Sequence, residues 1–259
     1  MMQWPSPSRI GWLLASIGVG FLFVLLWHFV AQARLVSPVF LPGPERVWDA
    51  LVYGLTEGDL AAKTLRTVER MIYGWLLASL IGILLGAMIG ISETARAYFE
   101  PTLEFLRPLP ASAMMPVAIV LLGLSDSMVL AVIAFGALWP MLLATVHGFA
   151  AVEPRLYQVS RALGMSRLAV IWKIALPSAL PDIMAGMRIG LTIALILAVV
   201  GEMLASRPGL GQAILLAARS FQSADLYAGV VLLGLIGYLS NMLLSSAEYR
   251  LLAWRNPPK

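Results

Sequence analysis

The sequence predicts an all-α integral membrane protein with about six transmembrane helices. Of its 259 residues, 60% are hydrophobic and only 12% are charged, and the mean hydropathy is +0.85. A water-soluble chain of this length could not hide so much apolar surface from water. The chain also returns repeatedly to apolar runs that are long enough to cross a bilayer.

Six spans account for these runs, and we place them at approximately 10–30, 68–91, 111–124, 128–146, 183–205 and 226–246. The first run is too long for the core of a signal peptide and lacks a convincing small-residue cleavage site, so we expect a retained helix. The third is short and begins among Pro108, Pro110 and Pro116. We expect it to be tilted or to lie partly against protein.

Glycines recur at multiples of four residues along one face of the second span, at Gly74, Gly82, Gly86 and Gly90. Such a face lets another backbone approach closely. Residues 92–107 are expected to form a short charged connection. Residues 206–211 are expected to break the chain after the fifth span and to precede a short amphipathic helix.

The longest interruption of the apolar pattern lies between the fourth and fifth spans, and residues 152–182 form its main part. Apolar residues recur there at helical spacing: Leu156, Val159, Leu163, Leu168, Ile171 and Trp172. Gly164 separates two short helices because glycine adopts positive φ without steric cost. Pro177 and Pro181 are expected to end the second helix. A loop lying on the lipid headgroups is the alternative.

Charges inside or beside the spans are few. Glu202 lies near the end of the almost uncharged run 189–204, where an ionised carboxylate is costly unless paired or hydrated. It either lines a translocation path or pairs with an arginine such as Arg207. Arg70 either attracts an anionic solute or forms a structural ion pair. Arg188 is expected to reach the headgroups or to brace the loop.

Lysine and arginine counts set the orientation. With the N-terminus in the cytosol, the outer side holds Arg34, Arg46, Lys63, Arg66, Arg70, Arg207 and Arg219. The inner side holds the larger set, Arg9, Arg96, Arg107, Arg155, Arg161, Arg167, Lys173, Arg188, Arg250, Arg255 and Lys259. The positive-inside rule therefore places the loop and both termini in the cytosol. In a membrane protein, the net charge of +4 indicates orientation rather than nucleic-acid binding.

Several chemical functions lack their motifs. The chain has no Cys, which excludes disulfides and thiolate catalysis. No Gly-x-x-x-x-Gly-Lys-Ser/Thr pattern is present for ATP binding, and no Gly-x-Ser-x-Gly pattern for a hydrolase. His28 and His147 lie in separate apolar spans and provide no metal ligand set, so we expect them to be polar packing residues. We assign no catalytic and no metal-binding residues.

The loop resembles the EAA loop of ABC-transporter permeases, whose pattern is Glu-Ala-Ala, three residues, Gly, nine residues, Ile-x-Leu-Pro. The corresponding residues are Gln158-Val159-Ser160, Gly164 and Ile174-Ala175-Leu176-Pro177. The spacing matches throughout, although the opening triplet differs. The resemblance implies that the loop couples the chain to an ATPase through Leu156, Gln158, Val159, Arg161, Ala162, Leu163, Gly164, Leu168 and Pro177.

Further motifs, in matching order over residues 41–254, resemble the nitrate/sulfonate/taurine subgroup of binding-protein-dependent permeases. They include LPGPERV at Leu41–Val47, Thr67-Val68-Glu69-Arg70, Leu106-Arg107-Pro108-Leu109-Pro110, Trp139-Pro140, Gly186-Met187-Arg188, Glu202-Met203 and Pro208-Gly209-Leu210-Gly211. The sequence departs from the subgroup at three positions. Lys63 stands where a His is common, Ala144 where an Asn is common, and Met128 where a Lys is common.

The resemblance implies a type I ABC importer fold, MetI-like, with cytosolic coupling helices. A single permease domain would fill residues 1–259, with an N-terminal helix at 10–30, a core at 64–250 and the coupling loop at 152–182. The implied partners are a second, identical permease copy, two ATP-binding subunits that hold ATP and Mg²⁺, and an extracytoplasmic solute-binding protein. This chain would then be a non-catalytic importer subunit of a bacterial or archaeal inner membrane. Arg70 and Glu202 are the candidate residues of the translocation path.

Two other classes of protein are the alternatives. An ion-coupled secondary transporter needs carboxylates at membrane mid-depth and often has internal repeats, and the sequence shows almost none of the former and no clear repeat. An intramembrane enzyme needs a nucleophile or a metal constellation. The sequence does not identify the solute, which we expect to be small and anionic.

Overall fold

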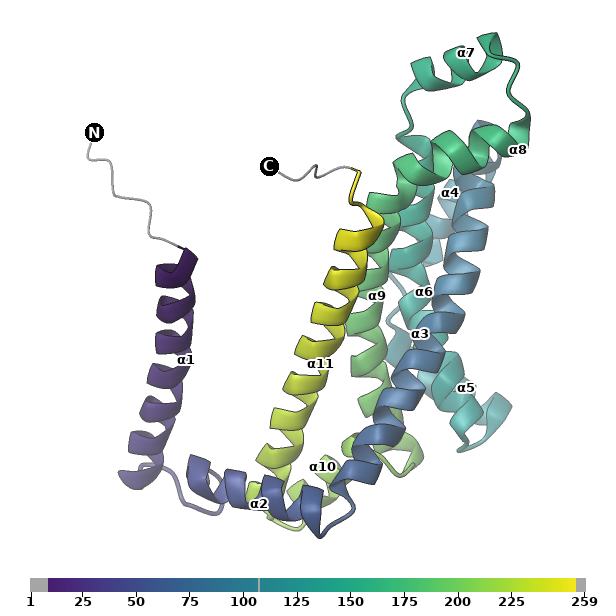
Figure 1. Cartoon of the computed structure of the whole chain (residues 1–259). Helices are drawn as coiled ribbons and strands as arrows, with labels where there is room; N and C mark the ends of the chain where they lie inside the picture. The colour runs from purple at the N-terminus through teal and green to yellow at the C-terminus, as the bar shows by residue number, and fades with distance from the viewer. Residues whose placement is uncertain (1–8, 107, 255–259) are drawn as a thin grey trace. The chain divides into compact units, whose positions relative to one another are not determined.

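The computed structural model describes residues 9–106 and 108–254, and its regular structure there is entirely helical (Figure 1). Arg107, Arg255 and Lys259 of the predicted inner set lie outside the described residues. The elements are α1 (Arg9–Gln32), α2 (Pro44–Thr56), α3 (Leu60–Ile91), α4 (Glu93–Leu106), the 3₁₀ turn η1 (Ala111–Met114), α5 (Met115–Leu122), α6 (Asp126–Ala150), α7 (Pro154–Ala162), α8 (Arg167–Val170), the π turn η2 (Ile171–Ala175), α9 (Leu176–Ala205), α10 (Leu210–Arg219) and α11 (Ser223–Leu251).

The described residues contain five helices that are long and apolar enough to cross a membrane: Leu14–Gln32, Leu60–Ile91, Asp126–Ala150, Arg167–Ala205 and Ser223–Leu251. A sixth span is possible if α4 pairs with η1 and α5, which are bent from it by 80°. The predicted all-α membrane fold with about six spans is therefore confirmed. The short third span belongs to the bent pair.

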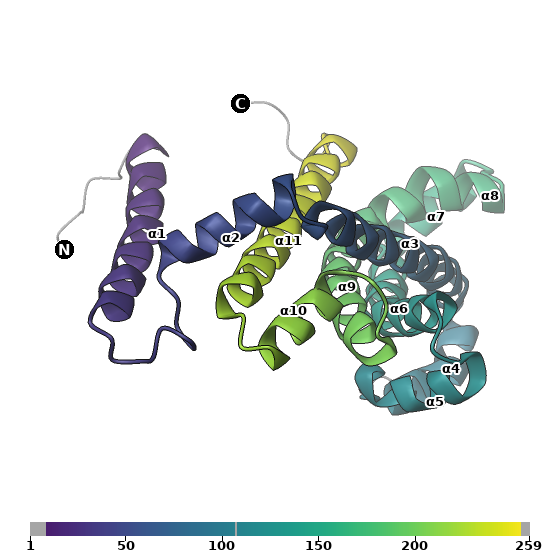
Figure 2. The same cartoon turned by 90° about the horizontal axis from the view of Figure 1, so that it is seen from below.

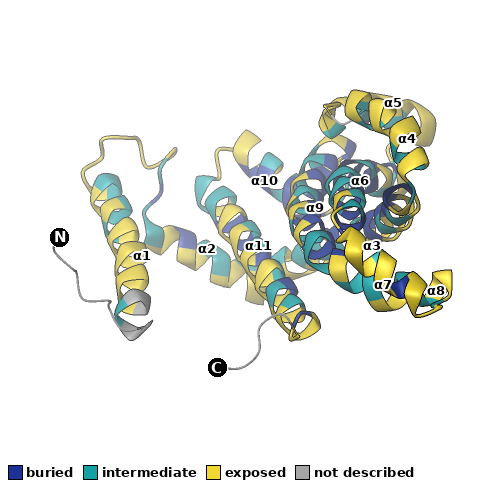
Figure 3. Ribbon diagram, turned by 90° about the horizontal axis from the view of Figure 1, so that it is seen from above, coloured by how far each residue is buried: buried dark blue, intermediate teal, exposed yellow. Residues whose placement is uncertain are grey.

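Contacts divide the chain into two compact units, 1–61 with 213–231, and 62–212 with 232–259. In the first unit, the indole N–H of Trp27 donates to the carbonyl of Pro42 at 3.0 Å, and its ring centroid lies 5.9 Å from that of Tyr227. Phe40 meets Phe221 edge to face. These aromatic contacts join α1 to α11, and the segment after α1 to the turn before α11. The surface of α1 itself is mostly exposed (Figure 3).

The second unit is built around α6, which packs against α3 on one side and α9 on the other (Figure 2). The predicted glycine face of α3 makes the first contact. A Cβ on Gly86 would lie 2.8 Å from the carbonyl oxygen of Leu142, and one on Gly90 would lie 2.9 Å from that of Val146. Side chains at these positions would push the two backbones apart. The prediction of a close helix approach is confirmed, and the partner is α6.

Glycines on α9 serve the same purpose on the opposite side of α6. A Cβ on Gly186 would lie 2.8 Å from the carbonyl oxygen of Pro140, and one on Gly190 would lie 3.1 Å from that of Ala137. Since lipid does not drive helices together by hydrophobicity, such close backbone packing is a main source of attraction in a membrane. Most of the buried surface of the second unit lies on these three helices (Figure 3).

The sequence predicts a short connection at residues 92–107, and this prediction is wrong, because residues 93–106 are helical. The segment is helix α4, which contains Pro101 in its interior. Ser92 starts it, because its hydroxyl accepts a hydrogen bond from the backbone N–H of Ala95 at 3.2 Å. Glu93 adds a negative charge in the first turn. The charged composition of the segment obscured this N-terminal capping signal.

The expected helix end at Pro177 and Pro181 is also wrong, because α8, η2 and α9 form one continuous helix, Arg167–Ala205. The π turn η2 lies directly before Pro177, and the N–H of Leu176 bonds to the carbonyl of Ile171. A proline cannot donate to the carbonyl four residues back, and its ring collides with that carbonyl in a regular helix. The wider π turn accommodates this defect without ending the helix.

The close packing of α3 on α6 predicts that Gly86→Ala destabilises the chain. The added Cβ would lie 2.6 Å from the Cβ of Thr145. We expect a loss of about 1–3 kcal/mol, typical of overpacking, measured as a lower midpoint of thermal unfolding in detergent. Gly234→Ala on α11 is the matched control, because nothing lies within 4 Å of its new Cβ. Equal midpoints for the two variants would contradict the packing described.

Candidate functional site

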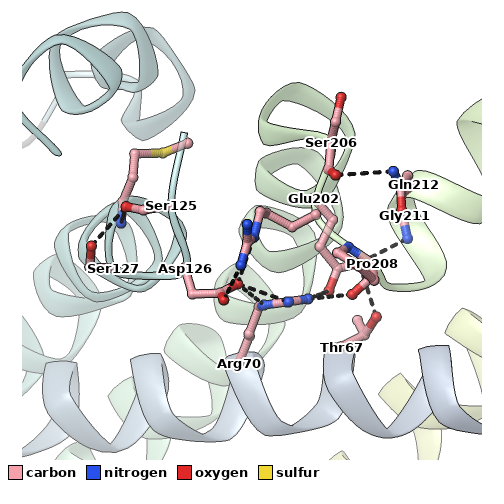
Figure 4. Close-up of polar contacts among 12 residues, drawn as sticks. Thr67, Arg70, Ser125, Asp126, Ser127, Glu202, Ser206, Pro208, Gly211 and Gln212 are labelled. Carbon is pink, nitrogen blue, oxygen red and sulfur yellow. Dashed lines mark hydrogen bonds and ion pairs between the residues drawn. The ribbon is translucent and has the colours of Figure 1, made fainter. Parts of the chain in front are cut away.

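Ionised side chains meet at the end of the second unit where α3 begins, α6 begins and α9 ends. The Nη1 of Arg70 on α3 donates to Oε1 of Glu202 on α9 at 2.8 Å and to the carbonyl oxygen of Pro208 at 2.8 Å. The Nε of the same guanidinium donates to Oδ1 of Asp126 on α6 at 3.1 Å. Figure 4 shows Arg70 reaching from α3 between the two carboxylates. One arginine thus joins three helices.

The carboxylate of Glu202 is fully buried and is bonded on both oxygens. Its Oε2 accepts from the hydroxyl of Thr67 at 2.9 Å and from the backbone N–H of Gly211 at 2.9 Å. The Thr67 hydroxyl oxygen in turn accepts from the N–H of Leu210 at 2.8 Å. A buried charge is tolerated only when it is paired and its lone pairs are used. Both conditions are met by Glu202 (Figure 4).

The segment after α9 folds back over this carboxylate. Ser206 has a φ of +51°, which ends α9 and reverses the chain. A Cβ on Gly209 would lie 2.2 Å from the Glu202 carboxylate, and one on Gly211 would lie 2.2 Å from the carbonyl oxygen of Val199. Only glycine leaves enough room at these two positions. The motif Pro208–Gly211 is therefore the cover of the buried charge.

One of the two predicted alternatives for Glu202, pairing with an arginine, is observed, but the partner is Arg70 and not the suggested Arg207. After the turn at Ser206, Arg207 binds Asp126 instead, with Nε to Oδ1 at 3.1 Å. Asp126 is the first residue of α6 and follows the N-cap Ser125, whose hydroxyl accepts from the N–H of Met128 at 3.2 Å. Its hydrogen bond with Asp126 raises the pKa of Arg207 above the ordinary value.

The predicted coupling residues lie at the opposite end of the second unit, on α7 and the helix that follows (Figure 1). Gly164 has a φ of +63°, so the predicted glycine turn is confirmed. Leu156, Val159 and Leu163 are 39%, 55% and 71% exposed. Exposed residues of the same set are Gln158, Arg161, Ala162, Gly164 and Leu168, whereas Pro177 is half-buried.

The inner face of α7 holds the helix in place. Tyr157 packs against a buried cluster that contains Phe149, Val152 and Ala175, and burial raises the pKa of Tyr157. Ser160, on the same face, is buried and bonds to the carbonyl of Tyr157 at 2.9 Å. With this face occupied, the apolar residues on the outer face have no partner in the part of the chain that the structure describes.

The sequence predicts that Arg188 reaches the headgroups or braces the loop, and the structure shows a contact that this prediction does not include. Its guanidinium forms an ion pair with Glu248 on α11. The Nε–H of Arg188 is buried and has no hydrogen-bond partner among the described residues. The partner lies 60 residues away in the sequence, so no local pattern could reveal it.

Sequence reasoning selected Arg70 and Glu202 separately and missed that they form one network. It also missed the carboxylate of Asp126 and the hydroxyl of Thr67. A usable signal existed, because Thr67-Val68-Glu69-Arg70, Glu202-Met203 and Pro208–Gly211 were all among the recognised motifs. In the described ranges, no group of three His, Asp or Glu side chains could hold a metal ion. The arrangement can fix helices and neutralise charge.

The chain is similar in sequence to a known family of transport proteins. Residues 78–255 match the model of the family described as binding-protein-dependent transport system inner membrane component. The chain belongs to this family. It is therefore a multi-pass inner-membrane permease of an ABC importer, a class that works with an ATP-binding subunit and a solute-binding protein. The predicted resemblance is confirmed.

Two relatives extend over nearly the whole chain. The putative aliphatic sulfonates transport permease protein SsuC of Bacillus subtilis is 29% identical over 97% of this chain and 91% of its own. The taurine transport system permease protein TauC of Escherichia coli is 29% identical over 97% of this chain and 92% of its own. This places the chain in the predicted nitrate/sulfonate/taurine-type subgroup.

Solved structures show the same fold at lower sequence identity. An inward-facing structure of the MetNI methionine ABC transporter superposes with a TM-score of 0.64 at 17% identity, covering 80% of this chain and 98% of the other. The predicted MetI-like fold of a type I importer permease is thus confirmed.

Replacing Arg70 tests how much the buried ion pair contributes to the stability of the chain. Arg70→Met leaves the Glu202 carboxylate buried without its counter-charge, so we expect a loss of about 3–5 kcal/mol in stability. The double variant Arg70→Met/Glu202→Met should recover part of this loss, because no buried charge is then unpaired. Thermal unfolding of the purified chain measures both.

Asp126→Asn is the control, because Asp126 is 48% exposed and its loss should cost about 1 kcal/mol or less. If Arg70→Met were no more destabilising than this control, the buried pair would not hold the helices together.

Proposed function

We propose that this permease forms the membrane path for a small organic sulfonate and is driven by a separate ATPase that binds α7. The observation that carries the proposal is the outer face of α7. Leu156, Val159 and Leu163 follow one another at helical spacing, and all three are exposed. A helix with one face packed and an apolar face uncovered is suited to a groove on a partner protein.

The surroundings of the apolar face fit a protein groove better than the headgroup layer. Gly164 turns the chain sharply between α7 and α8, so that these two helices, residues 154–170, form a short helical hairpin that carries the apolar face of α7. Leu168, just beyond the turn, is 70% exposed and extends the apolar surface. Arg161 lies at its edge and would remain hydrated at the rim of a complex.

A movement of the hairpin can be transmitted through the second unit along one continuous helix. The hairpin continues without a break into Arg167–Ala205, whose far end carries Glu202. The helix α6, 25 residues and about 37 Å long at 1.5 Å per residue, separates the two sites. ATP-driven closure of the partner ATPases would thus move α9 as a rod. The network at its far end would transmit the movement to α3 and α6.

Arg70 and Glu202, the candidate path residues, act in this proposal as part of the wall. Their charges are occupied by each other, by Asp126 and by the cover segment, so they fix the outer end of the path without contacting solute. Asp126 and Arg207 are the partly exposed members of the network.

The proposed assembly has two copies of this chain, two ATPases that hold ATP and Mg²⁺, and one extracytoplasmic solute-binding protein. The hairpin and both termini face the cytosol in this arrangement, in agreement with the distribution of Lys and Arg. The names of the relatives, which transport aliphatic sulfonates and taurine, support an organic sulfonate as solute. An ion-coupled secondary transporter is not favoured, because Glu202 is held in an ion pair at a helix end.

The ATPase-binding role of α7 predicts that Val159→Glu weakens association with the ATPase. The new carboxylate would be buried in the interface without a partner, which should weaken binding about tenfold or more. Because Val159 is 55% exposed, the free chain should still fold. Co-purification of the ATPase with the tagged permease from membranes measures the loss.

Gln158→Glu is the matched control. It introduces the same side chain at the neighbouring exposed position of α7, which also belongs to the predicted coupling set, but at this position it restores the Glu of the EAA pattern. The ATPase should co-purify with it as with the unmodified chain. If Val159→Glu also retained the ATPase in full, α7 would not be the coupling surface.

A further inference from the structure

A cavity of about 510 Å³ lies between α3, α9 and α11, and most of its lining residues come from α9 and α11. Its polar lining consists of Arg188 and Thr192 from α9 and Tyr238, Ser240 and Asn241 from α11. These positions fall near the middle of both helices, Leu176–Ala205 and Ser223–Leu251. These polar groups thus lie on two of the helices that are long and apolar enough to cross a membrane, where polar side chains are rare.

Hydrogen-bond donors in this cavity lack partners. The side chains of Tyr238, Ser240 and Asn241 make no hydrogen bond within the described part of the chain, and the Nε–H of Arg188 is buried and unbonded. An unsatisfied donor in the hydrocarbon layer costs several kcal/mol. The buried Nε–H of Arg188 consequently needs a hydrogen-bond acceptor from outside the described residues, and the side chains of Tyr238, Ser240 and Asn241 lie beside it in the same cavity.

The chemistry of the lining favours an anionic oxygen-rich group. A guanidinium N–H, an amide NH₂ and two hydroxyl groups can all donate to oxygen, and Arg188 is positively charged. Because Glu248 already balances the Arg188 charge, the cavity would bind an oxyanion weakly and release it. Weak binding is expected at a site that the solute occupies only transiently during transport, because tight binding would stop its release.

We propose that this cavity is a binding site within the membrane for the oxyanion head of the transported solute, with Arg188 and Asn241 as its main donors. The inference rests on the proposed transport function and adds the residues that contact the solute. The volume lies within the usual range of small-molecule sites, about 300–1,000 Å³.

Cysteine labelling can test the site directly, because the chain contains no Cys. Asn241→Cys and Thr192→Cys would be introduced separately into the complete transporter in nanodiscs. Each is then treated with a sulfonated, membrane-impermeant methanethiosulfonate reagent. We expect labelling about tenfold faster than at a lipid-facing thiol, because only hydrated thiols ionise and react. Ethanesulfonate should slow labelling of Thr192→Cys, which keeps both main donors, at least threefold, and sodium chloride of equal ionic strength should not, since bound oxyanion blocks access.

Leu239→Cys is the matched control, since Leu239 is exposed and lies at the same depth on the opposite face of α11. Arg188→Lys keeps the charge opposite Glu248 and removes the Nε–H. In that background, labelling of Thr192→Cys should continue while protection by ethanesulfonate is lost.

Three results would overturn the proposal. Thiols at Thr192 and Asn241 as inert as the control would mean that the cavity is closed by packing, for example by a second copy. Labelling without protection would mean a water-filled space with no solute site. Full protection of the thiol by ethanesulfonate in the Arg188→Lys background would show that Arg188 does not contact the solute. Recovery of the ATPase with the same cysteine variants shows separately whether the proposed coupling holds.

Discussion

The buried pair of Arg70 and Glu202 is the constraint on which the rest of the core depends. Neither charge could stay in this environment alone, so α3 and α9 must meet at one register. Asp126 brings the start of α6 to the same point, and the backbone of Pro208–Gly211 closes over it. The three helices are thereby fixed at one end, and their glycine faces can align along their length.

At the other end of the same helices, the structure leaves an uncovered surface. Tyr157 anchors α7 from the inside, and its outer apolar face has no partner in the described residues. The continuous helix Arg167–Ala205 connects this surface to Glu202. In the proposed mechanism, the ATPase would bind this surface, and the continuous helix would carry the movement to the network of Arg70 and Glu202.

Local signals in the sequence predicted much of this fold. The apolar runs gave the main spans, the spacing of Gly82, Gly86 and Gly90 gave a packing face, and Gly164 gave the turn. The predictions failed where non-local packing or backbone register decides the outcome. Pro177 does not end a helix because the π turn before it shifts the hydrogen bonds, and composition does not encode that turn. Glu202 pairs with a residue 132 positions away, which no local window reaches.

A distance measurement on the continuous helix tests the central claim, that α9 moves as one rod between the hairpin and the network. Spin labels at Trp172→Cys and Leu204→Cys, both at exposed positions, would be roughly 48 Å apart at 1.5 Å per residue. Pulsed electron paramagnetic resonance on the complete transporter should give the same narrow distance without nucleotide and with ATP trapped. A distance that shifts by more than about 5 Å, one helical turn, or that becomes broad would show a break near Pro177 and contradict the rod.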